Sequence, residues 1–156
     1  MTHTAAQLAP GLEGLPDRLA IAEQLAQYSY TADARDLKNF LSLFTEDAVW
    51  QSFAPGRTEP DIKLESRAAI GAFSAALWEE SPGLVSGDHQ SGLLFIELGA
   101  DAAKTKNMIL ISHQWPDQAM RIGTFGHYDT IWRKTAEGWL IASRTFYGCH
   151  RAPSTY

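Results

Sequence analysis

The sequence predicts a single α+β domain in which helices pack on one face of a curved, mainly antiparallel sheet. Its 156 residues suit one hydrophobic core. Segments with helical spacing of apolar residues come first, and long strand-like segments joined by short turns follow. Helices before strands favour an α+β arrangement, and the short turns favour an antiparallel meander.

Three helices are expected in the first half of the chain. The first begins at Pro16, a residue that favours the first helical turn, and ends near Ala32. Asp36 can cap a second helix and Ser66 a third, because their side-chain oxygens accept from free N–H groups. Residues 1–16 lack periodicity and are interpreted as an N-terminal arm.

Five strands are expected. They span residues 47–53, 89–98, 105–115, 120–134 and 139–147, and residues 54–65 are interpreted as a polar loop. The domain should therefore cover residues 17–148, with a C-terminal tail over 149–156.

Composition excludes several classes of function. A net charge of −5 without a basic stripe argues against a nucleic-acid partner. No apolar stretch suits a membrane span, and the start of the chain does not resemble a signal peptide, so a cytoplasmic protein is the default. Cys149 is the only cysteine, which leaves no internal disulfide and no zinc cluster.

Aromatic residues make up 11% of the chain and gather on the predicted strands, which suggests a ring-lined pocket as well as a core. Strand alternation places side chains into shared faces. The expected groups are Ile109, Ile111, His113 and Trp115; Ile122, Thr124, Gly126, Tyr128 and Trp132; and His89, Ser91, Leu93 and Phe95. Glycines within these strands are candidate bulges that would bend the sheet.

Four segments carry a resemblance to a known family. The stretches YSYTADARDLKNFLSLFTEDAVW, RAAIGAFSAAL, YDTIWRK and EGWLIASR resemble the SnoaL-like families of the nuclear-transport-factor-2-like superfamily. The resemblance covers residues 17–147. It implies a cone-shaped α+β barrel enclosing a pocket, and relatives that are commonly homodimers or homotrimers. It leaves the chemistry open, since one fold hosts many activities.

Within that superfamily the chain is most similar to scytalone dehydratase, with bile-acid 7α-dehydratase second. The first resemblance implies catalytic roles for Asp33, His89 and His113, and the second for Tyr28. Three positions depart from scytalone dehydratase: Trp50 replaces a tyrosine, Tyr128 an asparagine and Gly126 a serine. These departures argue against scytalone itself as the substrate.

Dehydration of a β-hydroxy carbonyl needs a base, an enolate-stabilising donor and an acid. The hypothesis is an Asp33–His89 dyad in which His89 acts as base and then acid, with Tyr28 or His113 donating to the substrate oxygen. Neither a metal nor an organic cofactor is required. The expected pocket comprises Trp50, Phe53, Phe73, Leu93, Ile111, Trp115, Thr124, Gly126, Tyr128 and Ser143. Arg144 should face away from Ser143 and the pocket, where it could pair with a helix carboxylate.

Simpler interpretations stay open. Asp33 could bond only to its turn, His89 could lie on the surface, and His113 could be a bonded core histidine. Alternative functions are a carbon–carbon lyase, isomerase or cyclase acting on an aromatic substrate in the same pocket. The chain could also be a non-catalytic small subunit of a ring-hydroxylating dioxygenase, or a ligand-binding protein. In each case other than the subunit, the partner is a small molecule.

Overall fold

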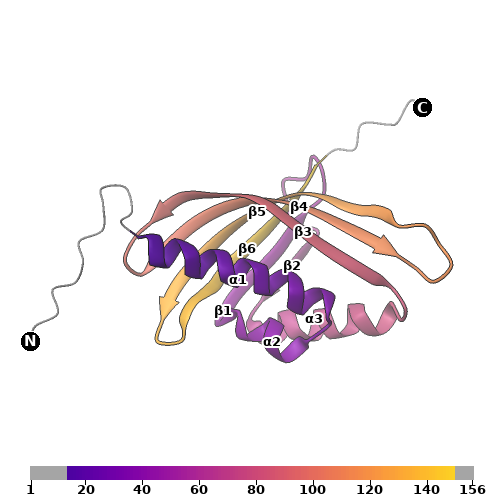
Figure 1. Ribbon diagram of the computed structural model, residues 1–156, viewed down its shortest axis with the longest axis horizontal. Helices are drawn as coiled ribbons and strands as arrows, with labels where there is room; N and C mark the ends of the chain where they lie inside the picture. The colour runs from indigo at the N-terminus through magenta and orange to yellow at the C-terminus, as the bar shows by residue number, and fades with distance from the viewer. Residues whose placement is uncertain (1–13, 150–156) are drawn as a thin grey trace, which may run out of the picture.

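The computed structural model describes residues 14–149. Three helices lie on one side of a curved six-stranded sheet (Figure 1). They are α1 (Leu15–Asp33), α2 (Leu37–Ser42) and α3 (Arg67–Glu80). The predicted α+β cone is thereby confirmed. The predicted arm and tail lie largely outside the described residues, and α1 already begins at Leu15.

The sheet has the order β2-β1-β6-β5-β4-β3. Its strands are β1 (Phe44–Phe53), β2 (Ile62–Glu65), β3 (Val85–Leu98), β4 (Ala102–Gln114), β5 (Arg121–Thr135) and β6 (Gly138–Gly148). The predicted meander is confirmed by the antiparallel pairs of β3 to β6. β1 pairs with β6 in parallel, and β2 forms an edge strand within the segment that was predicted to be a loop.

The helix starts follow the sequence signals. The Asp36 carboxylate accepts from the Asn39 N–H at 3.2 Å, and the Ser66 hydroxyl accepts from the Ala69 N–H at 3.0 Å. Both contacts satisfy N–H groups that a helix start leaves free. In α1, Ile21, Leu25 and Tyr28 recur at helical spacing and are buried against the sheet.

The hydrophobic core fills one end of the cone. Phe44, Trp132 and Ile141 are buried there, and the Trp132 indole donates to the Thr105 hydroxyl at 2.8 Å. The other end, between the last turns of α1, helix α3 and the sheet, is left hollow. The core also reaches the cavity wall, because Tyr28, Phe40 and Ile70 belong to both.

Two irregularities bend the sheet and change its faces. Gly92, with φ of 64°, lies between the paired residues Ser91 and Leu94 and forms a bulge in β3. A second shift lies opposite Gly123 in β5. Because a bulge reverses alternation, His89 before the bulge is exposed whereas Phe95 after it packs against the core, and the prediction that these two share a face is wrong.

No helix within residues 14–149 combines the length and apolar character needed to cross a bilayer.

Candidate active site

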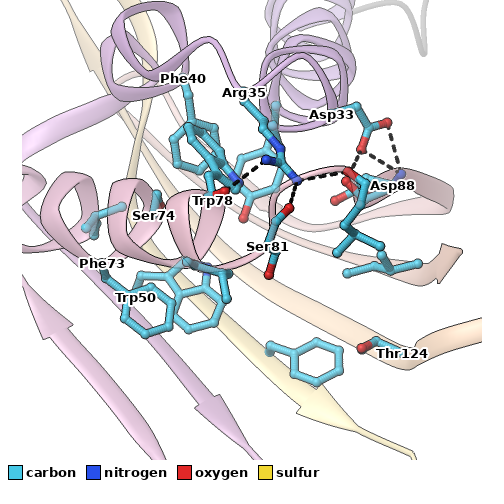
Figure 2. A pocket seen from close by; sticks show the side chains of 18 of the residues that line it. Asp33, Arg35, Phe40, Trp50, Phe73, Ser74, Trp78, Ser81, Asp88 and Thr124 are labelled. Carbon is cyan, nitrogen blue, oxygen red and sulfur yellow. Dashed lines mark hydrogen bonds between the residues drawn. The ribbon is translucent and has the colours of Figure 1, made fainter. Parts of the chain in front are cut away.

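A cavity of about 520 Å³ lies between α1, α3 and the inner face of the sheet (Figure 2). Its volume suits a small organic ligand. The residues that line it are Tyr28, Ala32, Asp33, Arg35, Phe40, Trp50, Ser52, Leu64, Ile70, Phe73, Ser74, Leu77, Trp78, Ser81, Leu84, Ser86, Asp88, Ile111, His113, Trp115, Thr124, Tyr128 and Phe146.

Aromatic rings form much of the wall. Trp50 from β1 and Phe73 from α3 are stacked, with ring centroids 6.4 Å apart and planes at 26°. Phe40 and Trp78 meet edge to face at 5.8 Å. Such rings favour a flat apolar ligand through stacking and edge contacts. Of the predicted pocket residues, the cavity contains Trp50, Phe73, Ile111, Trp115, Thr124 and Tyr128.

Four predicted pocket residues lie elsewhere. Phe53 stacks on Tyr147 with centroids 5.1 Å apart, and Leu93 lines a groove outside α1. Gly126 is buried, and a Cβ there would lie 2.6 Å from the Phe146 ring. Phe146, rather than Gly126, lines the cavity at this point. Ser143 pairs with Val49 and Ile131 and is not among the residues that line the cavity.

Asp33, the last residue of α1, reaches the main chain of β3. Its two carboxylate oxygens lie 3.1 and 3.0 Å from the N–H of Asp88, which donates to both, and the Ser86 hydroxyl lies 3.5 Å away (Figure 2). Asp33 therefore lines the cavity and also fixes the position of the strand opposite.

His89 is exposed, and its Nε2 lies 3.1 Å from the Ser112 hydroxyl. It does not line the cavity, and the predicted Asp33–His89 dyad is not formed. The reason is strand parity: Asp88 and His89 are neighbours, so only one of them can point inward. The side chain on the inner face is that of Asp88.

Tyr28 and His113, both predicted site residues, line the cavity from different sides. Tyr28 lies on α1 and is buried, and burial raises the pKa of its hydroxyl, while the nearby Arg144 charge acts in the opposite direction. His113 lies near the end of β4, directly opposite Ser86. The cavity thus holds a protonated phenol and an imidazole.

Arg144 lies in the interior, which corrects the expectation that it faces away. Its guanidinium sits 4.3 Å from the centroid of the Tyr28 ring and 3.8 Å from that of the Tyr128 ring. It donates to the Thr130 hydroxyl at 2.8 Å and to the Gln90 amide oxygen at 2.7 Å. Its strand neighbour Trp50 also faces inward, and this register determines the side on which Arg144 lies.

Tyr128 is the second buried phenol of the site. Burial is the main reason that the pKa of Tyr128 lies well above its ordinary value, and the nearby Tyr28 adds to the shift. The Arg144 charge opposes it. Its hydroxyl therefore stays protonated and is suited to donate rather than to act as a base.

Asp88 is a site residue that the sequence reasoning missed. Its Oδ1 accepts from the Ser29 hydroxyl at 3.0 Å, and its side chain is partly buried. Burial raises the pKa of Asp88, and the Asp33 charge adds to that effect, whereas the Ser29 bond and Arg144 lower it. The available signal was its place beside His89 on a strand, but without the register either residue could be the inward one.

Arg35 was also missed. It follows α1 with φ of 55° and donates to the carbonyl oxygens of Trp78, Ser81 and Leu84 at 2.9, 2.7 and 2.8 Å (Figure 2). These bonds attach the end of α3 and the loop after it to the rim of the cavity. No sequence motif announces such a contact, because its acceptors are all main-chain atoms.

Metal ligands do not gather in the part of the chain that the structure describes: no three His, Cys, Asp or Glu side chains there are placed to hold one ion. Cys149, at the end of the described range, carries a free thiol.

The fold and the cavity define a class, the cone-shaped α+β proteins of the nuclear-transport-factor-2-like superfamily. Within that class the sequence model of the SnoaL-like domain matches residues 13–145, so the chain belongs to the SnoaL-like family. No curated protein matches the sequence.

Solved structures agree with this fold. Rv3472 from Mycobacterium tuberculosis, of unknown function, is similar with a TM-score of 0.77 and 21% identity, covering 95% of this chain and 82% of that one. A proposed scytalone dehydratase from Novosphingobium aromaticivorans gives 0.72 and 20%, covering 88% and 87%. The beta subunit of a proposed aromatic-ring-hydroxylating dioxygenase from the same organism gives 0.76 and 17%, covering 92% and 95%. At these identities the likeness concerns the fold.

Proposed function

We propose that the protein is a cofactor-independent lyase of the dehydratase type that acts on a small aromatic or polycyclic hydroxy-carbonyl compound. One observation carries the proposal: His113, Tyr28 and two carboxyl groups share a single cavity whose walls are aromatic rings. An acid–base reaction needs titratable groups near a bound substrate, and an apolar cavity strengthens each of their interactions with it.

Each group has a distinct role. His113, whose imidazole suits proton removal near neutral pH, takes the proton next to the substrate carbonyl. Tyr28 stays protonated because burial raises its pKa, and it donates a hydrogen bond to the oxygen of the developing enolate. Asp33 acts as a positioning residue, since its carboxylate holds the Asp88 main chain.

The test is turnover of a panel of aromatic β-hydroxy ketones and diols, followed by the absorbance of the conjugated product. His113→Gln should lower kcat by about 10²–10⁴-fold, the usual contribution of a positioned acid or base. His127→Gln is the matched control and should leave kcat unchanged, because His127 lies on the outer face of the sheet and does not line the cavity. Equal activity of both variants and the wild type would remove the acid–base assignment.

Product analysis separates the other reaction classes. Carbon–carbon cleavage, isomerisation and cyclisation can all use a base and an enolate donor in the same cavity. Mass spectrometry of the product distinguishes loss of water from a split skeleton or an unchanged mass. A product other than the dehydrated one would leave the assignment of the active site intact but would change the assigned reaction.

A non-catalytic subunit is the second candidate. Apolar side chains are exposed on the outer face of the sheet, and the fold resembles that of a dioxygenase beta subunit. Such a subunit would need a large partner to be stable, whereas a lyase should be a soluble homo-oligomer by itself. Light scattering on the purified chain decides between these candidates.

A further inference from the structure

The cavity shares part of its wall with a second hollow. A more open groove runs along the other side of α1, between that helix and β3. It is lined by Ala22, Leu25, Ala26, Ser29, Tyr30, Asp33, Asp88, His89, Gln90, Ser91, Gly92 and Leu93. Asp33 and Asp88 line both hollows, so these two carboxyl groups form the partition between them.

The two carboxyl groups differ in what holds them. Both oxygens of Asp33 are engaged by the same main-chain N–H, a contact that requires a charged acceptor for its full strength. Asp88 instead bonds through Oδ1 to the Ser29 hydroxyl, which itself lines the groove and accepts from the Gln90 amide at 2.9 Å. Of the two carboxyl groups, Asp88 is therefore the one that the Ser29 hydroxyl connects to the groove.

We propose that Asp88 is the proton donor of the site and that it regains its proton from water in the groove, through Ser29, while substrate fills the cavity. The inference rests on the lyase function proposed above. It assigns the groove a role as a proton route, separate from the cavity that holds the substrate.

The steps balance. His113 removes the α-proton, and the electron pair of that C–H bond forms the enolate. The enolate then forms the C=C bond as the C–O bond breaks, and the departing hydroxyl takes the Asp88 proton and leaves as water. The Asp88 carboxylate next receives the Ser29 proton, and Ser29 takes one from groove water. His113 releases its proton when the cavity opens.

The surroundings of Asp88 favour a donor. Burial and the Asp33 charge raise its pKa, which keeps the carboxyl protonated to higher pH, while the Ser29 bond and Arg144 limit the shift. Tyr28 on α1 and Tyr128 on β5 face the same region as buried, uncharged phenols. His113 on β4 lines the same cavity and becomes positive on taking a proton, which would lower the pKa of Asp88 during the reaction.

Closing the groove tests the route without touching the cavity. Ala26 lines the groove only, and its neighbour Gln27 is exposed and lines neither hollow. Ala26→Phe should fill the groove and lower kcat at least about tenfold, with ligand binding by tryptophan fluorescence unchanged. Gln27→Phe is the matched control and should keep wild-type kcat. Asp88→Asn should lower kcat by about 10²–10⁴-fold.

Formate rescue and NMR sharpen the result. Added formate should restore activity to the Asp88→Ala variant. It should also restore activity to the double variant Asp88→Ala/Gln27→Phe. It should not restore activity to Asp88→Ala/Ala26→Phe. The Asp88 carboxyl, assigned by its loss in Asp88→Asn, should titrate above an ordinary aspartate in the ¹³C spectrum, and Ala26→Phe should raise that value further. If Asp88 titrates normally, or Ala26→Phe changes neither rate nor titration, the inference is overturned.

The two proposals fail separately. If the wild type turns over no compound of the panel, the lyase assignment is lost, and the ¹³C titration alone decides whether Asp88 exchanges protons with the groove. If turnover is found and depends on His113 but not on Asp88, the lyase assignment holds and the donor assignment is wrong.

Discussion

At the scale of single residues, the raised pKa of Asp88 makes the stability of the fold depend on pH. Its native pKa is raised above the ordinary value of 3.8, so between these values the native state binds more protons than the unfolded chain. Stability contributed by the protonated form is complete below pH 3.8 and is lost as the pH rises through the native pKa. Above its native pKa, the ionised Asp88 carboxylate therefore destabilises the fold.

Asp88→Asn should consequently leave the midpoint of thermal unfolding nearly unchanged at pH 3 and raise it progressively as the pH increases from 3 to 9. The amide can still accept from the Ser29 hydroxyl, so that contact survives. Differential scanning calorimetry across this pH range checks the sign. A variant that is less stable at pH 7 than at pH 3, relative to the wild type, would contradict the raised pKa.

The absence of a side chain at Gly123 leaves room for the His113 imidazole. A Cβ at Gly123 would lie 2.1 Å from His113 Nδ1, which forces the imidazole to move. Gly123→Ala should lower kcat about 10–100-fold, the range expected when a catalytic group is displaced by about an ångström. The matched control is Gly71→Ala, whose Cβ would lie 2.8 Å from Leu41 Cδ1, a side chain that does not line the cavity. Comparable loss in both variants would indicate general strain instead.

At the scale of elements, local signals were read correctly and non-local ones were not. Asp36 and Ser66 cap their helices as predicted, because an N-cap depends only on residues within one turn. The meander followed from its short turns. β2 escaped prediction because its four residues have no strong pattern of their own and pair with β1 across a loop.

The strand residues of the candidate site were predicted correctly only where side chains alternate regularly between the two faces of the sheet. His113 and Tyr28 line the cavity as expected, but His89, which precedes the Gly92 bulge, does not, and the unpredicted Asp88 lines it instead. Glycine marks a possible bulge without saying whether one forms, since that depends on the pairing partner. The inward position of Arg144 likewise follows from its pairing with Trp50, which no local pattern reveals.

Arg35 is the contact that joins α1 to the end of α3. Arg35→Ala removes three charge-assisted hydrogen bonds to carbonyl oxygens and should destabilise the fold by about 2–3 kcal/mol. Urea unfolding measures this difference. Arg57→Ala is the comparison, because Arg57 makes an exposed ion pair with Asp61 and should change stability by less than about 1 kcal/mol. Similar losses for both variants would show that the Arg35 contacts are weak.

At the scale of the whole molecule, the cavity is built directly on the hydrophobic core. The buried core around Trp132 and Ile141 continues into the cavity wall, because Tyr28, Phe40 and Ile70 belong to both. The existence of such a pocket could be foreseen from the family resemblance. Its boundaries could not, because they depend on how far the bulged sheet curls over α3.

The outer face of the sheet is apolar and electrically balanced. Phe125 and Ile131 on β5 remain 49% and 44% exposed there, and Met108 on β4 is exposed beside them. The flanking charges neutralise one another, since Lys106 pairs with Asp129 at 2.8 Å and Lys104 with Glu97 at 2.8 Å. A second copy of the chain would meet this face without net repulsion and would cover the apolar side chains.

We therefore expect the protein to self-associate through this face. Replacing both Phe125 and Ile131 by Glu should convert the oligomer to single chains, because the paired surface would then bury unpaired charges. Sedimentation velocity measures the change. Leu19→Glu, on the exposed side of α1, is the control and should leave the oligomer intact. A wild type that sediments as a single chain would contradict this prediction.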